Sequence, residues 1–293
     1  MKVRIGIGAA PIDAVGLDDL AAGITKFGFD SIWLPEVLSN PALDPSVALS
    51  YVAAKFPALK LGTTTLFSGV SPVALAKRLA SLDQLSGGRL LVTAVPGLTT
   101  DGEPGALGVH PRKGGPVIED ALEVIRALWR GETVTHSGPS GSFDGVRISP
   151  LPIQQPLEVW LGGNAEKSLQ RCGRIGDGWL PAMCTPSEVE RGREVIESAA
   201  VSAGRQISDE HYGVSIGYFT SEYPDGVSER LSSRLGGRKL EDVVPARREL
   251  VPQLLERFLE VGFSKFVLRP LEPVHSWDEE LSLLGPLVVG LQT

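Results

Sequence analysis

The chain has 293 residues, of which 42% are hydrophobic and 22% charged, and its formal net charge is −7. This composition is typical of a globular protein with a large core, and the mild negative charge disfavours nucleic acid as a partner, because such a surface needs clustered positive charge. No apolar run approaches the roughly 18 residues of a membrane span, and the first residues lead into a strand pattern rather than a secretory signal. The two cysteines, Cys172 and Cys184, offer no disulfide framework, so we expect a cytoplasmic protein.

Apolar periodicity predicts alternating strands and helices in the first third of the chain. The predicted strands cover residues 3–8, 31–34, 59–66 and 90–95. Helical spacing predicts helices that end near residues 28, 55 and 86, the second of which opens at Asp44-Pro45, a typical cap and first-turn pair. A glycine-rich loop at 96–116 then interrupts the alternation. Loops of that length are usually functional or mobile, so we expect a mobile lid at 97–116.

The alternation resumes after this loop. A helix is predicted at 118–129, a hairpin insertion at 133–150, and strands at 157–161, 178–181, 211–219 and 265–268. Asn164 is expected to cap the helix after the first of these strands, and capping-box patterns open two later helices at Thr185 and Ser276. A further helix with apolar residues from 251 to 258 stops at Gly262.

Eight strand–helix units predict an α/β fold with a parallel sheet, and eight of them favour a closed (β/α)8 TIM barrel. An open doubly wound sheet is the alternative, but the first strand is not followed by the Gly-x-Gly-x-x-Gly turn of a dinucleotide-binding domain. No linker divides the sequence, so we expect one domain over residues 1–293 with an insertion at 133–150.

A barrel of this kind places its site at the carboxyl ends of the strands. The candidates are therefore the residues that end or follow the predicted strands: Glu36, Thr63, Thr64, Thr65, Pro96, Gly97, Gly162, Gly163, Asn164, Pro181, Ala182 and Arg269. The turn at 162–164 is typical of a phosphate site, because glycines let backbone N–H groups approach a ligand at a helix start, although a plain tight turn has the same sequence.

Other candidates have more than one interpretation. Glu36 could donate a proton, accept hydrogen bonds from a cofactor, or be a solvated loop residue. Arg269 could bind an anionic ligand or form a surface ion pair, and Trp179 could contact substrate or pack in the core. The three threonines could bond a polar ring or reflect strand propensity. The four histidines are far apart in sequence, so we expect no metal site.

Five sequence blocks together resemble the luciferase-like monooxygenase superfamily, and within it the actinobacterial branch that uses the deazaflavin F420. The resemblance covers nearly the whole chain, and the blocks lie at residues 28–36, 61–76, 81–89, 159–163 and 176–181. It implies a barrel that binds F420 or FMN without a covalent bond. It assigns Pro96 and Gly97 to the ring, the 162–164 turn to the phosphate tail, and a non-prolyl cis peptide near Thr64-Thr65.

The resemblance implies an F420-dependent oxidoreductase in which hydride passes between the deazaflavin and a small organic substrate, with Glu36 as the catalytic candidate. An FMN-dependent monooxygenase fed by a partner reductase is the second hypothesis, and a non-catalytic flavin-binding protein is the third. A homodimer is compatible with each of them. Two departures disfavour sugar-phosphate oxidation: Val37 stands where such relatives carry histidine, and Leu98 where they carry glutamate.

Overall fold

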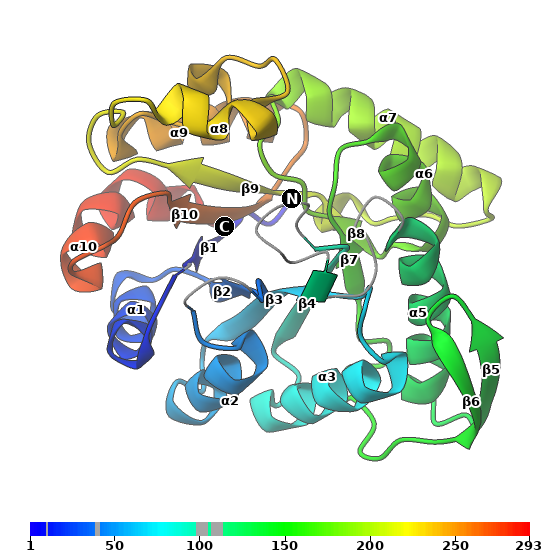
Figure 1. Ribbon diagram of the computed structural model, residues 1–293. Coiled ribbons are helices and arrows are strands. Elements are labelled where there is room, and N and C mark those ends of the chain that lie inside the picture. Colours follow the sequence, from blue (N-terminus) through cyan, green and yellow to red (C-terminus); the bar gives the residue numbers. More distant parts are fainter. Residues whose placement is uncertain (10, 39–41, 98–104, 107–113) are drawn as a thin grey trace. The chain divides into compact units, whose positions relative to one another are not determined.

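The computed structural model describes residues 1–9, 11–38, 42–97, 105–106 and 114–293, and its strands and helices alternate along the chain (Figure 1). The strands are β1 (Arg4–Gly8), β2 (Ser31–Pro35), β3 (Lys60–Leu66), β4 (Leu90–Val95), β5 (Val134–Gly138), β6 (Gly141–Val146), β7 (Val159–Leu161), β8 (Gly178–Trp179), β9 (Gly213–Tyr218) and β10 (Lys265–Pro270). The helices are α1 (Ala14–Phe27), α2 (Pro45–Lys55), α3 (Pro72–Ser86), α5 (Gly114–Trp129), α6 (Glu166–Ile175), α7 (Pro186–Ser202), α8 (Val227–Leu235), α9 (Val251–Glu260) and α10 (Trp277–Val288).

Eight of the strands form one sheet, in the order β8-β7-β4-β3-β2-β1-β10-β9. Strand β1 pairs in parallel with both β2 and β10. The two ends of this order also meet, because parallel bridges join Trp179 to Tyr212 and Ala182 to Ser215. A parallel eight-stranded sheet whose ends meet is the predicted (β/α)8 barrel, and the open-sheet alternative is wrong.

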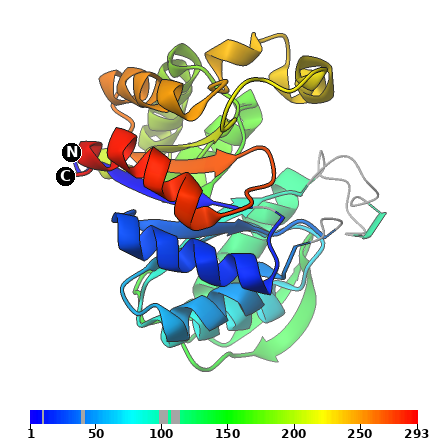
Figure 2. The ribbon, with the colours of Figure 1, turned by 90° about the vertical axis from the view of Figure 1, so that its left-hand side faces the viewer.

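The chain divides into two compact units. The first consists of Met1–Ala9, Val15–Trp33 and Trp160–Thr293, and the second of Ala10–Ala14 and Leu34–Val159. In the first unit the two termini lie side by side (Figure 2), because the Val3 N–H donates to the Thr293 hydroxyl at 3.0 Å. The expectation of a single domain over 1–293 stays a prediction.

The second unit contains the predicted hairpin insertion, which is confirmed as β5–β6 and lies beside α5 (Figure 1). Asp120 of α5 holds the hairpin, since its carboxylate accepts the Ser140 N–H at 2.8 Å and contacts His136 Nε2 at 2.9 Å. Burial acts to raise the pKa of Asp120, but hydrogen bonds from Ser140 and His136 outweigh it and leave the pKa below its ordinary value.

Local start signals in the sequence are mostly confirmed. The Asp44 side chain accepts the Ser46 and Val47 N–H groups at the start of α2, and Thr185 and Glu188 form the predicted capping box of α7. The cap expected at Asn164 is wrong, because Ala165 is the N-cap of α6 and no side chain bonds there. The local rule failed because the Asn164 amide binds a more distant carbonyl, that of Ala182, instead.

Helix α8 is an element for which the sequence analysis made no prediction. Its sequence, VSERLSSRL, is mainly polar and lacks a wide apolar stripe. The structure stabilises it through a small apolar cluster around Phe219, Leu240 and Val244, to which Val227 and Leu235 contribute. Among the described residues, no helix is long and apolar enough to cross a membrane.

Candidate functional site

In the second unit, strands β3 and β4 bring two threonines together near their carboxyl ends. Thr64 and Thr93 are register partners, so their side chains project from the same face of the sheet. Thr93 is 1% exposed, and its hydroxyl oxygen has no hydrogen-bond partner among the described residues. A buried hydroxyl without a partner costs about 1–3 kcal/mol, so this position indicates that a polar ligand atom or a water belongs there.

Thr93 is not among the residues that the sequence predicted for the site, since residues 90–95 were predicted only as a strand. Its signal was a single hydroxyl in the otherwise apolar run LLVTAV. The neighbouring candidates Thr63 and Thr65 are buried and lie 3.2 Å apart at their hydroxyl oxygens, so they bond each other. Of the three predicted threonines, Thr64 is therefore the one placed beside an unsatisfied polar group.

The non-prolyl cis peptide expected near Thr64-Thr65 is not found. Within the described part of the chain, cis peptide bonds precede only Pro150 and Pro156.

Pro96 and Gly97 follow β4 and are held from the end of β3. The Ser68 hydroxyl donates to the Pro96 carbonyl at 2.8 Å, and the Phe67 N–H donates to the Val95 carbonyl at 3.2 Å. Gly97 has a φ of +93°, a conformation that side chains other than glycine rarely adopt. Residues 98–104 and 107–113, on which the lid prediction and the comparison at Leu98 depend, lie outside the described residues.

Glu36 follows β2 and is only 7% exposed, so the interpretation as a solvated loop residue is wrong. Its carboxylate accepts the Leu66 N–H at 2.9 Å through Oε2 and lies 3.3 Å from Arg78 Nη2 through Oε1. Both oxygens therefore contact groups of the second unit itself. A catalytic role for Glu36 stays a prediction, and these contacts are also those expected of a carboxylate that holds the backbone in place.

In the first unit, the turn after β7 joins four of the predicted residues. The Trp179 indole donates to the Gly163 carbonyl at 3.0 Å, and the Asn164 amide donates to the Ala182 carbonyl at 3.0 Å. Gly163 has a φ of +94°, which favours glycine. No side chain caps the start of α6, so backbone N–H groups of its first turn remain for a ligand, and their positive dipole ends are typical of phosphate sites.

Pro181 and Ala182 follow β8 and join the sheet edge of β9. The Ser215 N–H donates to the Pro181 carbonyl at 2.8 Å, and Ala182 forms a bridge with Ser215. Met183 has a φ of +56°, the left-handed region that non-glycine residues seldom occupy. Such backbone strain clusters at ligand sites, and a cofactor role for Pro181 and Ala182 stays a prediction.

A cavity of about 340 Å³ lies beside Asn164 in the first unit, between α6 and α7. Arg238 lines it and donates through Nε to both oxygens of Glu188, at 2.9 and 2.8 Å. Burial acts to raise the pKa of Glu188, but bonds from Arg238 and Thr185 outweigh it and keep the pKa below its ordinary value. Burial also raises the pKa of the neighbouring Cys184 to about 12, so this wall of the cavity carries a neutral thiol.

The two predicted substrate residues have different surroundings. Trp179 is 1% exposed, borders the cavity of about 340 Å³, and contacts the Phe263 ring edge-on at 5.8 Å. A side chain at Gly192 would collide with the Trp179 ring, so the indole is packed under α7. Arg269 lies on β10, half-buried, on the same face of the sheet as Gly8. Substrate binding by either residue stays a prediction, and the packing of Trp179 disfavours it there.

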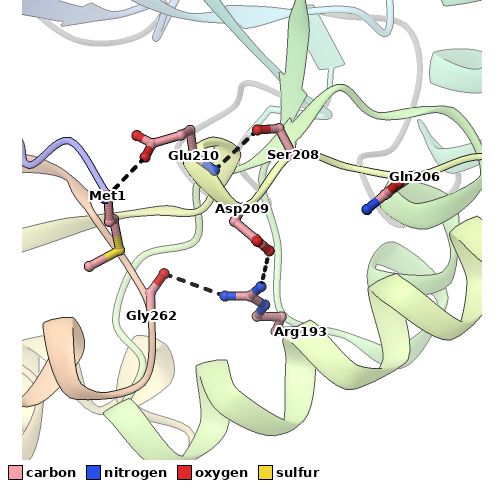
Figure 3. Close-up of a pocket in the computed structure, with 7 residues that line it drawn as sticks. All are labelled: Met1, Arg193, Gln206, Ser208, Asp209, Glu210 and Gly262. Atoms are coloured by element: carbon pink, nitrogen blue, oxygen red, sulfur yellow. Dashed lines mark hydrogen bonds and ion pairs between the residues drawn. The ribbon is translucent and has the colours of Figure 1, made fainter.

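A larger hollow, of about 870 Å³, lies at the other end of the strands of the first unit (Figure 3). Met1, Glu210 and Gly262 line it, and all three precede the strands β1, β9 and β10. Its charges are already paired, since Arg193 binds Asp209 and Glu210 lies near the N-terminal ammonium (Figure 3). Barrel chemistry takes place at the carboxyl ends of strands, so this hollow is a poor candidate despite its size.

Within the described residues, no group of three or more His, Cys, Asp or Glu side chains could hold a metal ion. The expectation of a site without a metal stays a prediction.

Solved structures share this fold over the full chain. An F420-dependent secondary alcohol dehydrogenase in complex with an F420-acetone adduct aligns with a TM-score of 0.83 at 18% identity, covering all of both chains. The F420-dependent tetrahydromethanopterin reductase of Methanopyrus kandleri aligns at 0.77 with 19% identity, again over both full chains. A riboflavin lyase with modified FMN aligns at 0.77 with 16% identity, covering 99% of this chain and 92% of the other. At these identities the likeness shows the fold, the luciferase-like (β/α)8 barrel.

The family model for luciferase-like monooxygenases matches residues 3–251, so the chain belongs to that family of flavin- or F420-dependent oxidoreductases. An uncharacterized protein of Mycobacterium tuberculosis is 32% identical over 176 residues, 59% of this chain and 61% of that protein. The phthiodiolone/phenolphthiodiolone dimycocerosates ketoreductase of the same species is 30% identical over 212 residues, 70% of this chain and 55% of that enzyme. The matches thus span less than two thirds of these relatives' lengths.

Proposed function

We propose that this protein is an F420-dependent oxidoreductase that transfers hydride between the deazaflavin and a carbonyl or alcohol group of a small organic substrate. The proposal is supported by the F420-dependent enzymes among its structural neighbours and by the ketoreductase among its relatives. The observation that carries the choice of a cofactor site lies near the ends of β3 and β4. There Thr64 is the register partner of Thr93, whose buried hydroxyl has no hydrogen-bond partner among the described residues.

The residues present fit such a cofactor in each unit. In the second unit, Thr64, Thr93, Pro96 and Gly97 offer hydroxyl and backbone groups suited to the polar edge and face of a ring. In the first unit, the turn at 162–164 and the uncapped start of α6 offer backbone N–H groups suited to a phosphate. Pro181 and Ala182 are proposed to border the same tail, since the Ala182 carbonyl is bonded to Asn164.

When bound, the cofactor supplies the hydride chemistry, and the protein's task is binding, orientation and exclusion of water. The Thr93 hydroxyl can donate one hydrogen bond to a ring carbonyl or accept one from a ring N–H. Arg269 is proposed to bind the polar end of the substrate, because guanidinium groups donate to carbonyl and carboxylate oxygens.

Titration of the purified protein with F420, FMN and FAD, followed by fluorescence, tests the proposal. Thr93→Val sharpens the test, because it keeps the shape and removes the unpartnered hydroxyl. The free variant should be more stable than the wild type by about 1 kcal/mol, while its affinity for the preferred cofactor should fall roughly tenfold. Thr25→Val serves as the control. It removes an α1 hydroxyl that donates to the Ala21 carbonyl at 2.9 Å, and it should leave the affinity for the preferred cofactor unchanged.

An FMN-dependent monooxygenase is the second candidate, favoured by the structural neighbour that holds modified FMN. It requires a partner reductase that supplies reduced flavin, so tighter binding of FMN than of F420, with oxygen consumption, would replace the first proposal. Binding of either cofactor without turnover on a broad panel of alcohols, aldehydes and ketones would indicate the non-catalytic alternative.

A homodimer is proposed on the evidence of one exposed apolar stripe. Val47 and Tyr51 lie four residues apart on α2, and Leu43 lies just before the helix; the three side chains are 69%, 47% and 38% exposed. Apolar residues at this spacing on a helix surface are typical of a packing interface. Sedimentation analysis should give a dimer that Val47→Glu converts to monomer, and a monomeric wild type would contradict the proposal.

A further inference from the structure

Glu36 completes the hydrogen-bond ladder between the ends of β2 and β3. Its N–H donates to the Thr64 carbonyl at 2.7 Å, as in a regular parallel pair. In such a pair the Leu66 N–H would next donate to the main-chain carbonyl of Glu36. Here the Leu66 N–H donates instead to the side-chain oxygen Oε2 of Glu36 at 2.9 Å. The carboxylate therefore takes the place of its own residue's carbonyl at the point where the chain leaves the sheet.

The second oxygen of Glu36 is held from the helix that follows β3. Arg78 of α3 places Nη2 at 3.3 Å from Oε1, and its side chain is 34% exposed, whereas the Glu36 side chain is 6% exposed. A buried carboxylate needs a compensating charge and hydrogen bonds, and Arg78 with the Leu66 N–H supplies both. The Glu36 side chain thus contacts both the end of β3 and the middle of α3.

The end of β3 in turn holds the end of β4. Two residues beyond Leu66, the Ser68 hydroxyl donates to the Pro96 carbonyl at 2.8 Å. Thr64, whose carbonyl accepts the Glu36 N–H, is the register partner of Thr93. Glu36 is therefore connected, through the backbone of β3 and the Ser68 hydroxyl, to Thr64, Thr93 and Pro96, which are proposed above to bind the cofactor ring.

We infer that Glu36 is a positioning residue that acts through the backbone of β3, with Arg78 as its partner, and that it is not the proton donor or acceptor of the reaction. The inference rests on the proposed function for its consequence, the geometry of the ring-binding residues. Its structural part, the tie between Glu36 and the Leu66 N–H, is independent of that function.

Three variants separate positioning from proton transfer. Glu36→Gln keeps an oxygen that can accept the Leu66 N–H, Glu36→Ala removes it, and Arg78→Met removes the ion pair alone. Hydrogen exchange at the Leu66 amide and cofactor affinity are measured for each. Glu36→Ala should accelerate exchange at Leu66 and weaken cofactor binding by roughly tenfold or more, the scale of a lost hydrogen bond to a charged group. Glu36→Gln should largely restore both quantities.

The second readout is the single-turnover rate of hydride transfer at saturating cofactor, measured with a substrate from the panel of alcohols, aldehydes and ketones. Glu36→Gln should retain the wild-type rate and the wild-type pH profile, because its proposed task needs an acceptor oxygen and no titration. Glu123→Ala, an exposed glutamate of α5, is the control and should alter none of the measurements.

Two results would overturn the inference. One is a saturating rate that falls about 10²-fold in Glu36→Gln, with an altered pH profile and unchanged affinity, which is the behaviour of a general acid or base. The other is unchanged Leu66 exchange in Glu36→Ala or, should that variant fail to fold, unchanged cofactor affinity in Arg78→Met. If the wild type binds neither F420 nor FMN, the proposed function fails. Hydrogen exchange at the Leu66 amide still tests the hydrogen bond between Glu36 and the Leu66 N–H.

Discussion

Replacement of Asp83 tests how the chain returns to the barrel after the hairpin insertion. Asp83 lies in α3 and is fully buried. Its Oδ2 accepts the N–H groups of Ile153 and Gln154 at 2.7 and 2.9 Å, and its Oδ1 accepts Gln154 Nε2 at 2.7 Å. The same Gln154 amide donates to the Leu90 carbonyl at 2.9 Å. One carboxylate therefore fastens the segment that follows the hairpin to α3, with Gln154 reaching the start of β4.

The expected cost follows from these bonds. Hydrogen bonds to a charged group contribute about 1.5–3 kcal/mol each, but bonds that share one acceptor are not additive. Breaking a buried charged arrangement typically costs about 3–5 kcal/mol, so we expect that loss for Asp83→Ala. Asp83→Asn should cost about 1–2 kcal/mol, because its oxygen can keep both backbone bonds while its NH2 group faces the Gln154 amide.

Urea unfolding followed by circular dichroism measures these losses, and Gln84→Ala is the matched control. Gln84 adjoins Asp83 and makes one exposed bond, to the Leu151 carbonyl at 2.8 Å, so its loss should cost less than about 1 kcal/mol. Cofactor affinity should be unchanged in all three variants. An Asp83→Ala variant as stable as the control, or one that folds normally but loses cofactor affinity, would refute the reasoning.

Further predictions concern the turn after β7, the thiols and the strand starts. Gly162→Val should lower cofactor affinity more than the melting temperature, since a side chain there obstructs the approach of backbone to a phosphate; the reverse outcome would make Gly162 a simple turn residue. Burial raises the pKa of both Cys172 and Cys184 to about 12, so a thiol-disulfide reagent should label them at pH 8 only as the protein unfolds. Bonds from Lys265 and the Lys2 N–H lower the pKa of Glu210 from its ordinary 4.5 to about 2. Its stabilising effect is present above pH 4.5 and is lost as the pH falls toward 2, so the difference in stability between wild type and Glu210→Gln should shrink from pH 7 to pH 3.

The sequence could predict those parts of the fold that depend on local pattern. The Asp44-Pro45 start of α2 and the Thr185–Glu188 box of α7 use bonds within four residues, and both are confirmed. The alternation of apolar runs likewise gave the number of parallel strands. The sequence pattern did not predict helix α8, because the helix is stabilised by residues such as Phe219 and Val244 that lie outside it in the sequence.

The candidate site was predictable in position but not in contacts. Parallel strands put their ends at one edge of a sheet, so strand ends could be named as candidates from sequence alone. The partner of Glu36 is Arg78, 42 residues away, and the acceptor of the Asn164 amide is the carbonyl of Ala182, 18 residues away. No propensity or spacing rule links such pairs, because their meeting depends on the packing of whole elements. The unpartnered Thr93 hydroxyl is visible only once its neighbours are placed.

The buried carboxylates of the described residues make contacts of the same kind, with groups from distant parts of the sequence. Glu36 binds a backbone N–H and an arginine, Asp83 binds two backbone N–H groups and an amide, and Glu280 binds the Tyr218 hydroxyl at 2.8 Å and Arg248 at 2.6 Å. Each is buried and tied to a segment distant in sequence, so each stabilises the scaffold.

The polar groups proposed to bind the cofactor at the strand ends are of a different kind. They are the Thr93 hydroxyl, which has no partner among the described residues, and the backbone N–H groups at the start of α6, which no side chain caps. Both kinds are neutral and do not titrate near neutral pH. Neutral donors of this kind can bind and orient a ligand, but they cannot supply the proton transfers of general acid–base catalysis. This division of roles is what a protein needs when a redox cofactor carries the reaction, and it is why the proposed function assigns the chemistry to a cofactor and positioning to the chain.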